Sequence, residues 1–221
     1  MSNNLIGRKV AKEASISFGG MGMGSLFRYL FSIMMARWLG PQMLGIYSLG
    51  NAITRIGEIF GIMGLDNGVL RYVSREKEKN DNVRNSIYSS IKMGFISSIF
   101  IGLLLYFSSD WIVLNLFNED TFLSTVIKVY ALTLPFTVTT LIASFATQGF
   151  KILKYKVFVN QIVNPFTLLL TMILSYVFFG VNVAILAPTV VSAVIGFFLI
   201  LHYLNSFVDI SFSKVLNAKF D

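Results

Sequence analysis

The sequence contains no cysteine, one histidine and few charged residues. The absence of cysteine excludes disulfides and thiolate metal sites, and a lone His202 argues against a metal centre built on histidines. Only 13% of the 221 residues are charged, against about 25% in a typical soluble domain. Paired carboxylates, a Ser/His/Asp arrangement and a phosphate-binding loop are also missing. The sequence therefore does not predict an enzyme, and we expect neither a cofactor nor a metal.

Hydrophobic residues are present in excess. They make up 55% of the chain and include 21 Phe and 9 Met, which indicates that lipid covers much of the surface. We predict an all-α integral membrane protein, because lipid offers no partners to backbone amides outside helices. Six apolar segments approach the ~20 residues that span a bilayer. They are 15–39, 42–65, 88–109, 122–147, 156–179 and 182–205.

The basic residues predict the topology. Most of the 18 Lys and Arg residues fall on the same side as residue 1, so the positive-inside rule places both termini in the cytoplasm. The predicted domains are a cytoplasmic N-terminus (1–14), a six-helix transmembrane lobe (15–205) and a cytoplasmic linker (206–221). The net charge of +7 then indicates contact with anionic membrane lipids and not with nucleic acid.

Two arginines, Arg28 and Arg55, lie deep inside the predicted spans. An arginine at a helix centre costs roughly 2.5–3.5 kcal/mol on the insertion scale, so it normally faces a partner or water. Glu58, three residues after Arg55, suggests either a structural ion pair or a counter-charge that balances Arg55 until an anion competes for it. Arg28 has no acidic neighbour on its own segment, which favours a cavity.

Polar residues recur at helical spacing around these arginines. The stripes predict a hydrated cavity lined by the first, second, fourth and fifth spans, with the third and sixth facing lipid. The alternative for the Thr and Ser residues is simple helix packing. The candidates for binding are Arg28, Asn51, Arg55 and Glu58, and the candidates for lining are Ser25, Ser32, Thr133, Thr137, Asn160 and Asn164.

The passage from Ala36 to Arg75 resembles a known family. ARWLGP at 36–41, GIY at 45–47, and GLDNG with RYVS at 64–74 are similar to polysaccharide-biosynthesis membrane proteins. These are oligosaccharide flippases of the multidrug/oligosaccharidyl-lipid/polysaccharide exporter superfamily. Members usually have two related lobes of six spans, and this chain resembles the first. The second lobe is expected to be a missing half, a partner chain or a second copy.

The resemblance implies a function. We expect a lipid-linked oligosaccharide to be flipped from the inner to the outer leaflet of the cell membrane by alternating access. The substrate of such flippases is typically an undecaprenyl-pyrophosphate-linked repeat unit. Basic residues of the first two spans would hold the pyrophosphate, a role that Arg28 and Arg55 match by location. The alternatives are a related multidrug or cation antiporter, which should expose membrane carboxylates, and a truncated, non-transporting membrane subunit.

Overall fold

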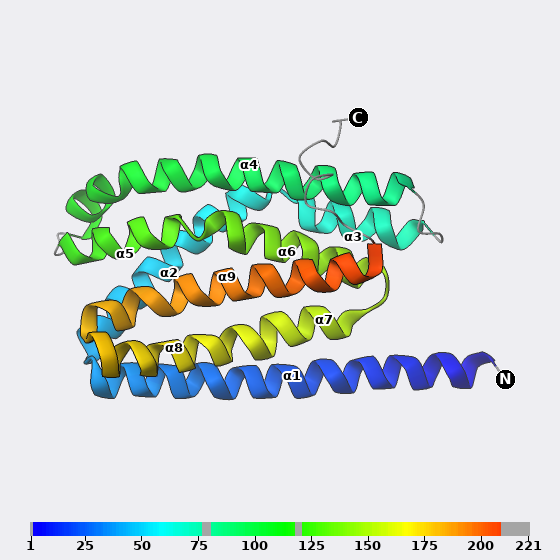
Figure 1. Ribbon diagram of the computed structural model, residues 1–221, viewed down its shortest axis with the longest axis horizontal. Coiled ribbons are helices and arrows are strands. Elements are labelled where there is room, and N and C mark those ends of the chain that lie inside the picture. The colour runs from blue at the N-terminus through cyan, green and yellow to red at the C-terminus, as the bar shows by residue number, and fades with distance from the viewer. Residues whose placement is uncertain (1, 77–80, 118–120, 209–221) are drawn as a thin grey trace.

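The computed structural model describes residues 2–76, 81–117 and 121–208, and in this part of the chain every regular element is helical. The helices form a bundle whose long axes run roughly side by side, with α2 inclined across the others (Figure 1). Predictions for residues 77–80, 118–120 and 209–221 lie outside the described residues. The elements are α1 (Ser2–Trp38), α2 (Pro41–Ile62), α3 (Leu65–Arg75), α4 (Asp81–Ile112), η1 (Val113–Phe117), α5 (Thr121–Ala131), α6 (Leu134–Gly149), α7 (Leu153–Val157), η2 (Phe158–Val163), α8 (Asn164–Phe179) and α9 (Val181–Val208).

Within the described residues, three helical stretches are long and apolar enough to cross a membrane: Asp81–Asn115, Leu153–Phe179 and Val181–Ser206. A fourth, Phe122–Ala131 with Leu134–Gly149, passes only as a pair bent by 44°. The helices α1 and α2 are not among them, because glycine, serine, asparagine and arginine lower their hydropathy. The all-helical membrane class is thus shown, whereas six spans are not.

The first two predicted spans differ from the observed helices. The polar start predicted to precede the membrane belongs to α1, which continues without a break from Ser2 to Trp38. The second predicted span ends early, because Met63 and Gly64 adopt left-handed conformations with φ of 51° and 77°. The chain then enters the separate helix α3, whose Val69 and Val73 are buried while Arg71 and Arg75 are exposed. This short helix is amphipathic, as expected of a connection at the membrane surface.

Two prolines interrupt the α-helical hydrogen bonding of predicted spans: Pro135 follows the 44° bend between α5 and α6, and Pro165 lies within the continuous stretch Leu153–Phe179. Pro135 cannot donate a hydrogen bond to Ala131, and Pro165 cannot donate one to Gln161, because proline has no N–H. In both cases the released carbonyl faces a glycine on a neighbouring helix. A Cβ at Gly102 would lie 2.9 Å from the Ala131 oxygen, and a Cβ at Gly24 would lie 2.1 Å from the Gln161 oxygen. Proline and glycine are therefore matched across two helix contacts.

The segment before Pro165 is wound as a π-helix, η2, between the short α7 and α8. A π turn inserts about one extra residue per turn, which rotates the following side chains relative to the preceding ones. Residues of the fifth predicted span therefore do not share one continuous face.

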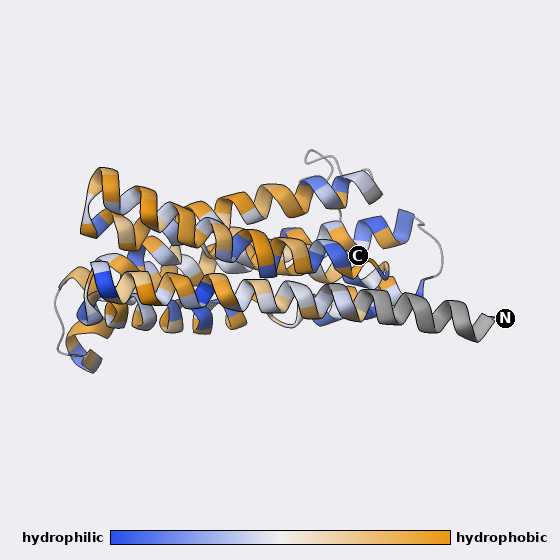
Figure 2. Cartoon of the chain, turned by 90° about the horizontal axis from the view of Figure 1, so that it is seen from below, coloured by the Kyte–Doolittle hydropathy of each residue, from blue (hydrophilic) through white to orange (hydrophobic). Residues whose placement is uncertain are grey.

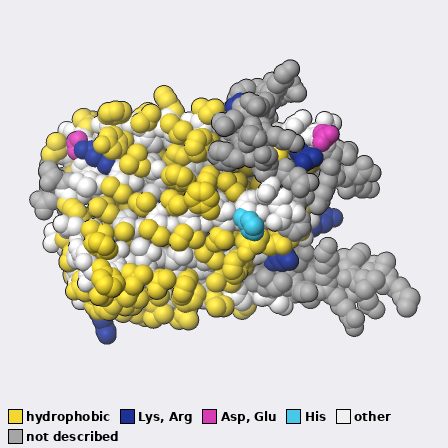
Figure 3. Space-filling view, in the orientation of Figure 1, with side chains coloured by type: hydrophobic (Ala, Val, Ile, Leu, Met, Phe, Trp, Pro, Cys, Tyr) yellow, Lys and Arg dark blue, Asp and Glu magenta, His cyan; other side chains and the backbone are white. Residues whose placement is uncertain are grey.

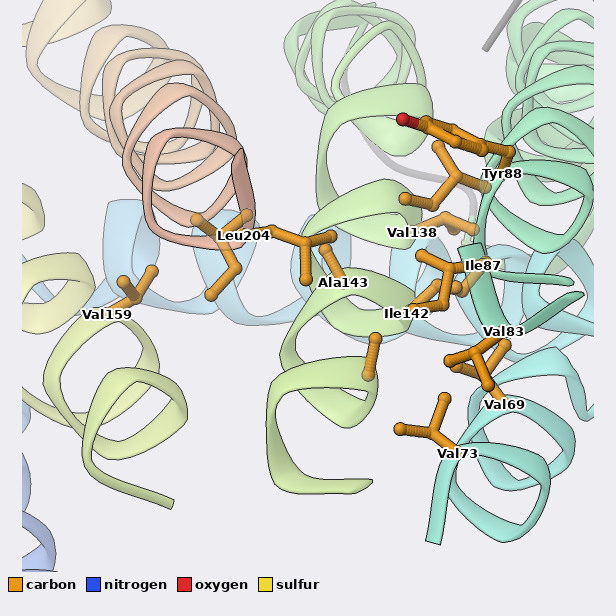
Figure 4. Packing of buried hydrophobic residues seen from close by; sticks show 13 residues of the cluster. Val69, Val73, Val83, Ile87, Tyr88, Val138, Ile142, Ala143, Val159 and Leu204 are labelled. Carbon is orange, nitrogen blue, oxygen red and sulfur yellow. The ribbon is translucent and has the colours of Figure 1, made fainter. Parts of the chain in front are cut away.

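The largest core cluster joins α3, α4, α6, η2 and α9 (Figure 4). Val69 and Val73 of α3 contact this cluster together with Ile87 of α4 and Ile142 of α6, and all four are almost fully buried. The α9 stretch is 44% buried over its most apolar window, against 22% for α4 and 17% for Leu153–Phe179. The expectation that the last span is among the more lipid-facing is wrong, because α9 packs between α8 and α6.

Hydrophobic side chains cover most of the surface that Figure 3 shows, and the coloured charged side chains lie towards the two ends. Figure 2 shows hydrophilic residues gathering towards the end of the bundle where the N-terminus lies. Phe100, Phe107 and Phe178 are 66%, 77% and 72% exposed, which would be costly in water. This surface is that of a protein that crosses a membrane several times.

Helices α1 and α2 have different packing neighbours. Helix α1 packs along α7, η2 and α8, whereas α2 packs along α4, α5 and α6. The link between α1 and α2 is a short turn at Leu39 and Gly40, where Gly40 has φ 91°. Because α2 inclines away from α1 after this turn (Figure 1), the two helices diverge.

Candidate functional site: a cavity between α1, α2 and α8

A cavity of about 430 Å³ lies where α1 and α2 diverge, with α8 forming the third wall. Its lining contains two guanidinium groups, three hydroxyls and one amide. Among the lining residues of the described chain there is no carboxylate. The lining residues are Arg28, Phe31, Ser32, Tyr47, Ser48, Asn51, Ala52, Arg55, Pro165 and Leu168.

Arg28 reaches from α1 towards the π segment η2. Its Nη2 donates hydrogen bonds of 3.3 Å to the Asn160 backbone oxygen and of 3.3 Å to Gln161 Oε1. Both are long for a charge-assisted bond, which is typically about 2.7–2.9 Å. A guanidinium carries five donors in a fixed fork, so Arg28 is oriented by η2 while donors remain for a further ligand.

Arg55 lies on α2 on the other side of the cavity, and its side chain is exposed. The ion pairs between described residues are Arg84–Asp81 and Lys128–Asp110, so no carboxylate oxygen of Glu58 lies within 4.0 Å of Arg55. Glu58 is half-buried on the same helix and is not among the lining residues. A direct ion pair of Arg55 with Glu58 is therefore not present among the described residues, and the role of Glu58 as a counter-charge at longer range stays a prediction.

The polar residues beside the arginines are tied to their own helices. Ser32 Oγ donates to the Arg28 carbonyl at 3.0 Å, and Ser48 Oγ donates to the Leu44 carbonyl at 2.8 Å. Asn51 Nδ2 donates to the Tyr47 carbonyl at 3.1 Å. The hydroxyl oxygens and the amide oxygen can still accept hydrogen bonds from a ligand or water. Ser25 is exposed on α1 but is not among the lining residues.

The threonines of the fourth predicted span lie away from the cavity. Thr133 is buried at the break between α5 and α6, where its Oγ1 donates to the Tyr130 carbonyl at 2.7 Å. Thr137 Oγ1 lies 3.2 Å from the Leu134 carbonyl of its own helix. Both hydroxyls bond backbone at the helix break that precedes Pro135.

The two asparagines of the fifth predicted span also point elsewhere. Asn160 Nδ2 donates to Ser144 Oγ of α6 at 2.9 Å, so only its backbone oxygen reaches Arg28. The amide oxygen of Asn164 faces α9, where a Cβ at Gly196 would lie 2.6 Å from it. Because η2 rotates the chain, Pro165 and Leu168 line the cavity in place of these asparagines.

The apolar residues of the lining could not be predicted from the sequence. Phe31 and Tyr47 face each other across α1 and α2 with ring centroids 5.0 Å apart, and both resemble ordinary core residues in the sequence. Gln161, the partner of Arg28, directly follows Asn160 in the sequence. Helical spacing from the other polar residues of this span does not indicate it as a candidate. Whether any of these residues contacts a substrate stays a prediction.

The fold and the cavity define a helical, multi-pass membrane protein with a basic cavity within its apolar bundle. A comparison with protein families matches the description "Polysaccharide biosynthesis protein" over residues 10–219, and the chain belongs to this family. Comparisons with curated proteins and with solved structures found no match. The protein is thus a membrane protein of polysaccharide synthesis or export, and members of this family are typically transporters or flippases rather than enzymes.

Proposed function

We propose that the protein flips a lipid-linked oligosaccharide from the inner to the outer leaflet of the cell membrane. The observation that carries the proposal is the pair Arg28 and Arg55 in a cavity whose described lining has no carboxylate. A guanidinium fork binds phosphate oxygens in bidentate fashion and does so more strongly away from bulk water. A pyrophosphate-linked sugar, such as an undecaprenyl-pyrophosphate repeat unit, supplies that anion, and a polyprenyl tail suits the apolar bundle.

The proposed arrangement in the membrane has six spans with both termini in the cytoplasm. Helices α1 and α2 count as spans in this proposal although their hydropathy is low, because polar residues are tolerated where a helix lines a cavity. The domain division 1–14, 15–205 and 206–221 is proposed on the same grounds. A second six-span lobe, from the same chain, a partner or a second copy, would cover the cavity and permit alternating access.

The antiporter alternative is less well supported. A cation or a cationic drug calls for an unpaired carboxylate in the cavity, whereas Glu58 is outside the described lining. A non-transporting subunit would not require two arginines around one cavity within the bundle, since each is costly to place in a membrane.

The test is substitution of both arginines in the complete protein. Arg28→Ala with Arg55→Ala is expected to reduce surface polysaccharide at least tenfold and to accumulate lipid-linked oligosaccharide in the inner leaflet, at unchanged membrane abundance. Arg37→Ala is the matched control, because Arg37 is an exposed arginine of α1 outside the lining. Arg28→Lys should lose most of the activity, since a point charge replaces a fork. Normal polysaccharide with both alanines would overturn the proposal.

A further inference from the structure

A second cavity of about 260 Å³ lies between α9 and the segment in which α7 passes into η2. It shares no lining residue with the first cavity. Apart from one lysine, its described lining is aliphatic or aromatic. The lining residues are Lys154, Tyr155, Val157, Phe158, Ile162 and Tyr203.

Three aromatic rings, one each from α7, η2 and α9, form one wall of this groove. The Tyr155 and Tyr203 ring centroids are 4.5 Å apart at 32°, and Phe158 meets Tyr203 edge-on at 6.3 Å and 81°. Phe158 is nevertheless 41% exposed, so this wall is open to its surroundings. An apolar, open wall of fixed rings on the membrane-facing part of a bundle is a surface against which an acyl chain packs.

A single positive charge lies at the same groove. Lys154 Nζ is 4.7 Å from the Tyr155 ring centroid, and no carboxylate of the described residues lies within 4.0 Å of it. Lys154 is the second residue of the apolar stretch Leu153–Phe179. The charge therefore lies where that stretch begins, at the depth of lipid headgroups, and tyrosines are enriched at this depth.

We propose that this groove binds one anionic phospholipid. An acyl chain lies against Tyr155, Phe158 and Tyr203, and the headgroup phosphate is held by Lys154. A net negative headgroup is preferred because the lysine has no described acidic partner. One lysine near a membrane surface corresponds to about a fivefold preference for an anionic over a zwitterionic lipid. The site is independent of the transport proposed above, since no residue is shared.

The experiment is native mass spectrometry of the purified full chain from nanodiscs that contain equal amounts of phosphatidylglycerol and phosphatidylcholine with identical acyl chains. Wild-type protein should retain about fivefold more phosphatidylglycerol, and Lys154→Gln should bring the ratio to within about twofold of one. Lys151→Gln removes the same charge from an exposed residue outside the groove, and it should keep the wild-type ratio.

A second pair of variants tests the apolar part. Ile162→Trp fills the groove and should lower retention of both lipids at least threefold, whereas Leu170→Trp places the same ring on the exposed surface of α8 and should not. Equal retention of the two lipids by wild type would overturn the proposal. A Lys151→Gln effect as large as that of Lys154→Gln would do the same, because it would show a diffuse charge effect.

Discussion

Gly24 offers the most quantitative test of the fold, because α1 meets the backbone of η2 at this residue. A Cβ at Gly24 would lie 2.1 Å from the Gln161 oxygen and 3.0 Å from its carbonyl carbon. Ordinary contact begins at 3.4 Å, so Gly24→Ala requires the two backbones to separate by about 1 Å. Gly22, half a turn away, has no atom within 4 Å of the corresponding position and supplies the matched control.

The expected size follows from these distances. Forcing an extra methyl group into a packed contact costs about 1–3 kcal/mol, and here the contacted atoms are backbone, which cannot rotate away. At about 2–4 °C per kcal/mol for a chain of this length, Gly24→Ala should lower the melting temperature by roughly 2–12 °C. Gly22→Ala should raise it slightly, because alanine is favoured over glycine within a helix by about 0.5–1 kcal/mol.

The assay is thermal unfolding of both variants in one detergent at one scan rate, followed by circular dichroism at 222 nm. The apparent midpoint of Gly24→Ala should lie below wild type and that of Gly22→Ala at or above it. Equal midpoints for the two alanine variants would refute the close approach of α1 to η2. The displacement should also weaken the Arg28 contact with Asn160, so reduced polysaccharide export is expected in the complete protein.

Three further outcomes are expected. Glu58→Gln should leave surface polysaccharide within about twofold of wild type, measured at equal protein abundance, because the residue does not line the cavity. Lys128→Ala and Asp110→Ala should each lower the melting temperature only slightly, and a double-mutant cycle of melting temperatures should show coupling that weakens in salt, since this 2.8 Å ion pair is partly exposed. Tyr130→Phe should destabilise by about 1 kcal/mol in the same assay, because its buried hydroxyl donates a 2.8 Å hydrogen bond to the Ile185 carbonyl.

The helical membrane class could be predicted from the sequence, because the apolar segments are long and carry few charges. Turns that depend on one residue were also readable: α9 begins directly after Gly180, which has φ 85°. The π winding of η2 could not be predicted, because it depends on Pro165 and on the glycine of α1 that receives the released carbonyl.

For the site, helical spacing indicated the arginine stripes of α1 and α2, and the structure places Arg28, Asn51 and Arg55 around one cavity. The same spacing could not distinguish Thr137, which bonds within its bundle, from a lining residue. Polar side chains satisfy helix backbone as readily as they face water, so periodicity alone does not separate the two. Phe31 and Leu168 line the cavity as apolar residues, for which spacing offers no contrast with the core.

The short turn at Gly40 has a mechanical consequence for the two guanidinium groups. Arg28 lies on α1, which packs along α7, η2 and α8, and Arg55 lies on α2, which packs along α4, α5 and α6. The covalent link between these two helices is only Leu39 and Gly40, and Gly40 has a backbone conformation that few other residues adopt. Mutual repulsion of the two positive charges would press these two helices apart, and an anion bridging them would draw them together. Binding of the proposed diphosphate would therefore draw α1 and α2 together at the cavity, and its release would let them separate.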